Sequence, residues 1–170
     1  ELNLDGTEVH LIYVGPCHQV GDTIVHVPKE RVVFAGDVLF RQCTPMGWTG
    51  TYEKWFQCLD LIIELDPEVI VPGHGPLCGI EGAMEMKAYL EYVRDESKQC
   101  FDNGLPSLEA AKRIEFGPYG EWRAPARLYM NVERAYREFR NEPPDAPWDT
   151  ARTFDAIYQV AKAKGIEVEY

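Results

Sequence analysis

The chain has 170 residues, of which 45% are hydrophobic and 26% are charged, a composition typical of a globular protein with a packed core. Its 28 acidic and 17 basic side chains give a formal net charge of −11, which repels nucleic-acid phosphates and anionic lipid surfaces. No apolar run approaches the ~20 residues of a membrane span, and the first residues lack the features of a signal peptide. We therefore expect a soluble, cytoplasmic protein that binds neither nucleic acid nor membranes, with an export signal on a longer precursor left open.

The first half of the chain predicts strands on either side of a helix. Three apolar runs, Glu8–Val14, Thr23–Pro28 and Val32–Ala35, predict strands, and the charged turn between the second and third predicts an antiparallel hairpin. From Thr51 to Leu65 the apolar residues recur every three to four positions, which predicts an amphipathic helix. The run Glu68–Val71 predicts a buried strand that the following Pro/Gly loop brings to an end.

The second half predicts helices. Apolar residues at helical spacing mark helices over 83–93, 128–139 and 151–163, and Ser107 is the expected N-cap of another. The stretch Asn141–Pro147 predicts a stiff linker, and Ile166–Tyr170 an extended tail. The order of elements predicts a layered α/β body over residues 1–103 and a helical appendage over residues 104–170.

The five cysteines are dispersed and include no C-x-x-C pair, which argues against a zinc ribbon or a dithiol redox motif. We interpret them as reduced, half-buried thiols. They are Cys17, Cys43, Cys58, Cys78 and Cys100.

Three residues able to bind a metal ion each follow a predicted strand. His18 and His74 lie in Gly/Pro loops, and Asp37 ends the run VVFAGD. Because strand ends on one edge of a sheet converge on one crevice, we expect the three side chains to lie close together. Imidazole and carboxylate ligands suit zinc, iron or manganese. Taken singly, each has a structural interpretation as well: a loop histidine bonded to backbone, or a turn aspartate capping its strand.

Other polar residues receive supporting or structural interpretations. Asp22 is expected to hold the His18 loop by accepting backbone N–H groups. His10 and His26 lie inside strand runs and are not expected to be ligands. Tyr52, Trp48 and Trp55 are interpreted as core residues, with a substrate wall near Asp37 as the alternative, and the acidic residues of the appendage as solvated faces.

The motifs GPCH-x-x-GD, VVFAGD and VPGHGP resemble, in order and approximate spacing, the later metal motifs of the metallo-β-lactamase-fold superfamily, over about residues 8 to 100. In that superfamily two αβ halves pack their sheets face to face around a dinuclear site, usually of zinc. The resemblance implies that His18 binds the first metal, His74 the second, and Asp37 bridges both as the catalytic carboxylate. Gln19 departs from the Thr or Ser that commonly follows this histidine.

The superfamily's H-x-H-x-D-H motif is absent from all 170 residues. The chain therefore resembles the carboxy-terminal half of such a protein, the half of an αββα sandwich followed by a helical appendage. The resemblance implies a metal-dependent hydrolase whose metal-bound hydroxide attacks an ester, thioester, lactam or similar bond of a small molecule, with this chain alone inactive. An uncovered apolar sheet face would favour a homodimer or association with the missing amino-terminal half. A metal-free structural module and a mononuclear iron oxygenase of the same fold are the alternatives.

Overall fold

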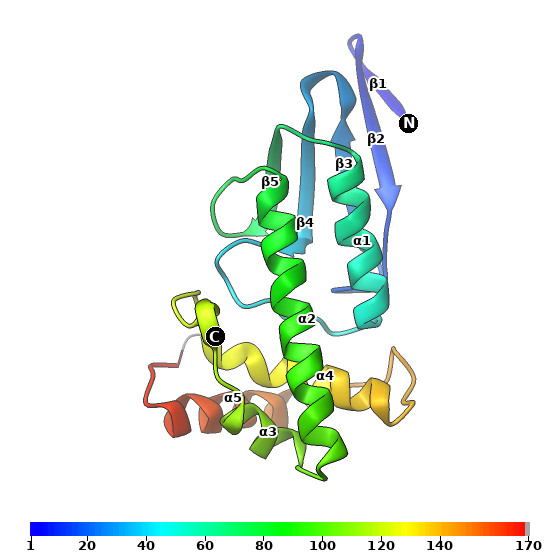
Figure 1. Cartoon of the computed structure of the whole chain (residues 1–170). Coiled ribbons are helices and arrows are strands. Elements are labelled where there is room, and N and C mark those ends of the chain that lie inside the picture. The colour runs from blue at the N-terminus through cyan, green and yellow to red at the C-terminus, as the bar shows by residue number, and fades with distance from the viewer. Residues whose placement is uncertain (169–170) are drawn as a thin grey trace. The chain divides into compact units, whose positions relative to one another are not determined.

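The computed structural model describes residues 1–168 (Figure 1). Its strands are β1 (Leu2–Leu4), β2 (Thr7–Tyr13), β3 (Thr23–Val27), β4 (Val32–Phe40) and β5 (Val69–His74). Its α-helices are α1 (Tyr52–Glu64), α2 (Ile80–Asp102), α3 (Ser107–Arg113), α4 (Leu128–Phe139) and α5 (Thr150–Lys164). Single 3-10 turns lie at Pro28–Glu30, Gly117–Tyr119 and Pro125–Arg127. Among the described helices, none is long and apolar enough to cross a membrane.

The chain forms two compact units. The first comprises Glu1–Arg41 and Thr49–Ala88, and the second comprises Gln42–Trp48 together with the chain from Tyr89 onward. The units therefore divide within α2, and each contains segments distant in sequence. The predicted boundary near residue 103, between an α/β body and a helical appendage, stays a prediction.

The first unit contains a five-stranded sheet in the order β1-β2-β3-β4-β5. Strands β3 and β4 pair antiparallel with Val25 opposite Phe34, which confirms the predicted hairpin. Strand β5 joins the edge of the sheet parallel to β4, after a crossover through α1. A parallel pair needs such a crossover, and the amphipathic α1 supplies it while burying its apolar side.

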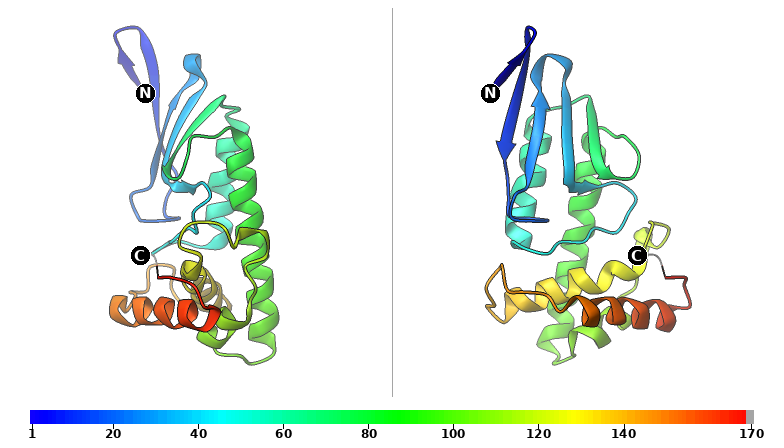
Figure 2. Two further views of the ribbon diagram at one scale, coloured as in Figure 1. Left: turned by 90° about the vertical axis from the view of Figure 1, so that its left-hand side faces the viewer. Right: turned by 180° about the vertical axis from the view of Figure 1, so that it is seen from behind.

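The two faces of the sheet differ in what covers them. Helix α1 and the first part of α2 run along one face of the sheet (Figure 2). Ile24, Val33 and Ile70 are fully buried. The opposite face carries an apolar row across four strands, set by the register of Leu11, Val25, Phe34 and Val71. In this row Leu11 is 53% and Phe34 46% exposed, so the helices of this unit leave the face open.

Two predicted strand ends are wrong. Strand β4 does not stop at Ala35 but continues through Gly36 and Asp37 to Phe40, with register shifts against β5 on both sides of Gly36. Strand β5 does not stop at Val71 but includes Pro72 and runs to His74. The register shift at Gly36 accommodates the glycine, and proline, which has no backbone N–H, is tolerated in an edge strand at a position where the sheet needs no donor.

Helix α1 confirms the predicted amphipathic helix. Thr51 caps it, since its hydroxyl accepts the Lys54 N–H. Tyr52 and Trp55 are 1% and 0% exposed, which confirms them as core residues, and the indole N–H of Trp55 donates to the Val38 carbonyl at 2.8 Å.

The second unit contains α3, α4, α5 and the later part of α2, close to the predicted helices. Ser107 is the first residue of α3 rather than its N-cap, which is Pro106, and its hydroxyl instead donates to Glu133. Glu133 also accepts from Arg140 at 2.7 Å and is 15% exposed, so its interpretation as part of a solvated face is wrong. Residues 166–168 have no regular secondary structure, and the rest of the predicted tail lies outside the described residues.

Candidate metal centre

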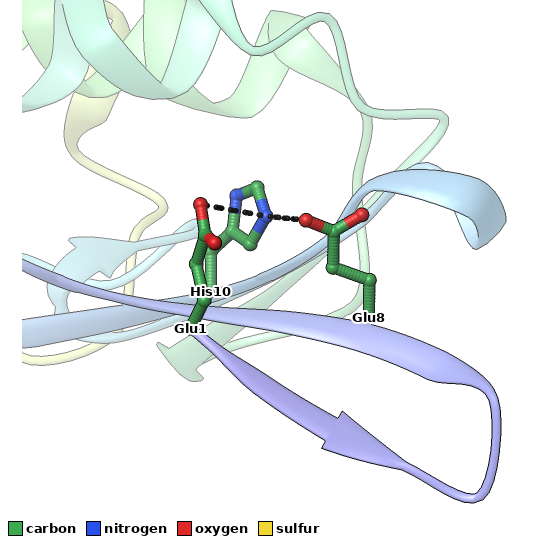
Figure 3. Close-up of side chains that lie close together, drawn as sticks. All are labelled: Glu1, Glu8 and His10. Atoms are coloured by element: carbon green, nitrogen blue, oxygen red, sulfur yellow. Dashed lines mark hydrogen bonds and ion pairs between the residues drawn. The ribbon is translucent and has the colours of Figure 1, made fainter.

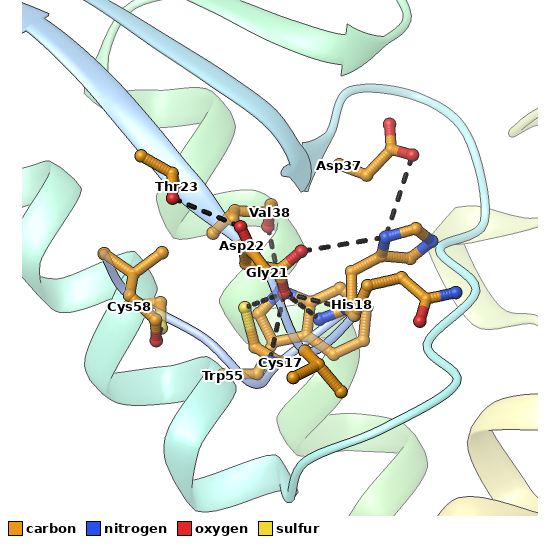
Figure 4. A network of polar contacts seen from close by, with 12 residues as sticks. Cys17, His18, Gly21, Asp22, Thr23, Asp37, Val38, Trp55 and Cys58 are labelled. Atoms are coloured by element: carbon orange, nitrogen blue, oxygen red, sulfur yellow. Dashed lines mark hydrogen bonds and ion pairs between the residues drawn. The ribbon is translucent and has the colours of Figure 1, made fainter. Parts of the chain in front are cut away.

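The loop after β2 holds His18 in place through Asp22. One carboxylate oxygen of Asp22 accepts the backbone N–H groups of Cys17, His18 and Gln19 at 3.1, 2.6 and 2.9 Å (Figure 4). The other oxygen lies 3.9 Å from His18 Nδ1. These contacts confirm the prediction that Asp22 holds this loop. Because one carboxylate fixes three consecutive amides, the loop presents the imidazole in a defined position.

Asp37 lies at the bulge in β4 rather than beyond a strand end. Gly36 has a φ of 53°, a conformation that favours glycine, and it turns the chain where β4 loses its regular register with β5. Gly73 on the neighbouring strand leaves the space that the carboxylate occupies, since a Cβ there would lie 2.1 Å from Asp37 Oδ1. The turn at Gly36 and the space at Gly73 therefore determine where the Asp37 carboxylate lies.

His74 ends β5 and is held by the end of β4. Its carbonyl accepts the Arg41 N–H at 2.8 Å, and its Cα is paired with that of Phe40. Gly75 follows with a φ of 91°, and a Cβ at this position would lie 1.8 Å from the Arg41 carbonyl oxygen. Only glycine lets the chain turn so close to β4, so the turn that follows His74 is locally determined.

The structure brings the three predicted site residues together. His18 Nδ1 lies 3.7 Å from one oxygen of Asp37, and His74 Nε2 lies 3.4 Å from the other. Within the described part of the chain, the three side chains do not form a group whose ligand atoms all lie within 4.8 Å of one another. Asp37 thus stands between the two imidazoles with one oxygen toward each. This donor set fits a carboxylate shared by two ions, and the ligand roles stay predictions.

The cysteine nearest to the site belongs to the core. Cys17 is fully buried, and its thiol donates to Asp22 at 3.0 Å. A hydrogen bond with the Cys58 side chain, together with burial, raises the pKa of the Cys17 thiol well above its usual range. All five cysteines are free, and four of them are buried rather than half-buried.

A second group of possible ligands lies on β1 and β2. His10 Nε2 is 2.8 Å from Glu8 and 3.8 Å from Glu1, and the ligand atoms of all three lie within 4.8 Å of one another (Figure 3). The pairing of β1 with β2 brings Glu1 beside His10, and the strand period places Glu8 on the same side. Both glutamates are exposed, and exposed acidic groups of this kind are common without a metal. The prediction that His10 is not a ligand stays a prediction.

The sequence pattern did not identify Phe40 as part of the site. Its ring stacks on the His74 imidazole with centroids 4.7 Å apart and an angle of 12°, and lies 6.1 Å from the His18 ring. The only sequence feature that could have indicated Phe40 is the apolar run Val38–Phe40 directly after Asp37. The pattern assigns this run to no element, because the strand is expected to end before it.

Comparisons with known proteins give one family match and several partial relatives. Residues 1–74 match the family described as the metallo-beta-lactamase superfamily. The alpha subunit of 2,4-dinitroanisole O-demethylase from a Nocardioides strain is 34% identical over 79 residues, covering 44% of this chain and 23% of that protein. A metallo-beta-lactamase type 2 from Bacteroides fragilis is 29% identical over 103 residues, covering 57% of this chain and 41% of that protein. The chain thus spans less than half of either relative.

Solved structures share the fold. A metallo-beta-lactamase family protein from Thermus thermophilus superposes with a TM-score of 0.64 and 18% identity, over 82% of this chain and 46% of that chain. A sec-alkylsulfatase from Pseudomonas sp. superposes with a TM-score of 0.64 and 15% identity, over 95% of this chain and 31% of that chain. The second superposition extends over the helices as well as the sheet.

Proposed function

We propose that this chain supplies one half of a hydrolytic metal centre, on the premise that residues 1–74, which match the metallo-beta-lactamase superfamily, have its metal-dependent hydrolase-type fold. The observation that carries the proposal is the position of Asp37 between two imidazoles, at 3.7 and 3.4 Å. A carboxylate with one oxygen toward each of two histidines suits ligation shared between two metal ions.

His18, Asp37 and His74 would hold the metal, for which zinc is the proposed identity. When bound, the metal supplies a Lewis acid that lowers the pKa of a coordinated water toward neutrality. The residues of this chain then have distinct tasks. The two histidines would act as ligands, Asp37 would balance the positive charge, and Asp22 holds the loop that presents His18.

The substrate is a small molecule with an ester, thioester, lactam or related bond. The two curated relatives are named for different substrates, a dinitroanisole and a beta-lactam, so we commit to the hydrolytic chemistry and to no single substrate. Three protein donors are fewer than two ions require, and a catalytic zinc normally keeps three protein ligands of its own. We therefore propose that this chain alone is inactive.

The test uses residues 1–170 together with the second αβ layer that the proposal requires, supplied on the same chain or as a separate one. We expect this assembly to hydrolyse at least one of three chromogenic probes: nitrocefin, p-nitrophenyl acetate or a thioester followed with a thiol reagent. A strong chelator should abolish the activity and added zinc should restore it. Chelator-resistant hydrolysis would contradict a metal centre, and a protein that carries no metal and cleaves none of the probes would favour the metal-free module.

The open sheet face predicts how the other half associates. The row Leu11, Val25, Phe34 and Val71 is apolar, and no helix of its own unit covers it. Burial of apolar surface stabilises by about 25 cal/mol per Å². We propose that a second αβ layer, carrying the missing ligands, packs here. The chain matches less than half of its relatives' length, which leaves room for such a layer.

We expect the isolated chain to expose this face. Light scattering after size exclusion should show concentration-dependent dimers, and a dye specific for apolar surface should bind. Replacing both Leu11 and Phe34 with Ser should reduce dye binding, whereas replacing the exposed Leu77, which lies outside the sheet, should not. A monomer that binds no dye at high concentration would show that the face is not a docking surface.

A further inference from the structure

One buried aromatic ring contacts both candidate metal-binding histidines. Phe40 is 2% exposed and lies at the end of β4, three positions after Asp37. Its ring is parallel to that of His74 within 12°, in a stacked arrangement whose centroid distance of 4.7 Å lies in the range that aromatic pairs prefer. On another side it meets the His18 ring at 6.1 Å and an angle of 57°.

The backbone determines where this ring lies. The bulge at Gly36 shifts β4 so that Phe40 pairs with His74, and the Arg41 N–H bonds the His74 carbonyl directly after it. The Phe40 N–H points to the Met86 sulfur at 3.2 Å, which anchors the residue to α2 within the same unit. Phe40 therefore has little freedom to move, and the bulge that exposes Asp37 also sets the ring beneath His74.

The two histidines differ in how they are otherwise held. Asp22 fixes the His18 loop through three amides, whereas the His74 side chain is 48% exposed and has Asp37, at 3.4 Å, as its polar neighbour. Among the described residues, the only aromatic ring stacked on His74 is that of Phe40. An exposed imidazole without such a support would sample several rotamers and would lose entropy on binding a metal.

We propose that Phe40 is a positioning residue that holds the His74 ring, and to a lesser extent the His18 ring, in the orientation that faces Asp37. The proposal rests on the proposed function in assigning a metal to these histidines, but the positioning is a property of the metal-free chain. Phe40 has no polar side-chain atom and takes no part in ligation.

The first test is NMR of the histidine rings in the metal-free chain. We expect nuclear Overhauser contacts between the Phe40 ring and the rings of both histidines, and upfield positions for the His74 ring protons because they lie over an aromatic face. In Phe40→Leu these protons should move downfield. Phe56→Leu is the matched control: it removes another buried ring of the same unit, one that lies against the ring of Tyr52, and should leave the His74 signals unchanged.

The second test is zinc binding. Loss of a group that orients a metal ligand typically weakens affinity about 10- to 100-fold, and we expect an effect of this size for Phe40→Leu and none for Phe56→Leu. Phe40→Tyr keeps the ring and should restore both the upfield shifts and the affinity, which a purely structural loss would not predict.

Equal effects of Phe40→Leu and Phe56→Leu on the His74 signals would overturn the proposal. So would the absence of contacts between the Phe40 and His74 rings in the unmodified chain, a measurement that needs no variant to fold. If the ring contacts and shifts appear as expected but zinc perturbs neither histidine, the positioning stands and the proposed metal centre fails.

Discussion

Asp37→Asn is expected to lower the zinc affinity of the His18 and His74 pair by more than about 100-fold. Loss of an outer partner of a ligand already costs about 10- to 100-fold, and Asp37 is placed as a direct ligand. Asparagine keeps the shape of the side chain but removes the negative charge that lies between the two imidazoles, at 3.7 and 3.4 Å. The unmodified chain should itself bind zinc weakly, because it offers only three donors to two ions.

The measurement should resolve the individual histidines, since Glu1, Glu8 and His10 form a second possible group. Zinc titration followed by the imidazole nitrogen signals should move His18 and His74 in the unmodified chain, and not in Asp37→Asn. Asp5→Asn is the matched control: Asp5 is exposed, and its φ of 52° suits asparagine. Nanomolar affinity of the monomeric chain, or equal affinity of the Asp37→Asn chain, would contradict the shared site.

Asp22→Ala is expected to destabilise the chain by about 2–4 kcal/mol. The carboxylate accepts from Cys17, His18 and Gln19, and hydrogen bonds to a charged group contribute about 1.5–3 kcal/mol each, only partly additive here because water reaches some of the freed amides. Urea denaturation followed by circular dichroism measures the loss. Asp22→Asn keeps an oxygen acceptor and should lose less.

The variant Asp149→Ala, which removes an ordinary helix N-cap, provides a reference for the loss of stability in Asp22→Ala. The Asp149 side chain caps α5 by accepting a single N–H, that of Arg152 at 3.0 Å, and loss of an N-cap costs about 1 kcal/mol. Asp22→Ala should therefore cost clearly more than Asp149→Ala, and it alone should move the NMR signals of His18. Similar losses in the two variants would show that Asp22 is an ordinary turn residue and does not organise the His18 loop.

The elements with strong local patterns were predictable. Helix α1 has apolar residues at helical spacing after a capping Thr51, and the β3–β4 hairpin has two apolar runs around a charged turn. The role of Asp22 also follows from local chemistry, because a short carboxylate beside glycine binds nearby amides. The convergence of His18, Asp37 and His74 was predicted from strand ends that meet at one edge of a sheet, although Asp37 lies within β4.

The errors arose where a tertiary contact overrides a local preference. Gly36 and Pro72 predict strand ends, yet β4 continues past Gly36 with its last three residues buried. Strand β5 accepts Pro72 because it lies at the sheet edge. Ser107 has the chemistry of an N-cap, but its hydroxyl donates to Glu133, a residue 26 positions away that no local pattern can connect to it.

The sequence by itself predicted the kinds of element and the three residues of the candidate metal site, because these follow from patterns between near neighbours in the chain. Only the tertiary structure decided that Asp37 stands between the two histidines and that Phe40 stacks on one of them. Both depend on how the bulge in β4 aligns Phe40 with His74, a pairing of residues 34 positions apart that is set by the register of the whole sheet.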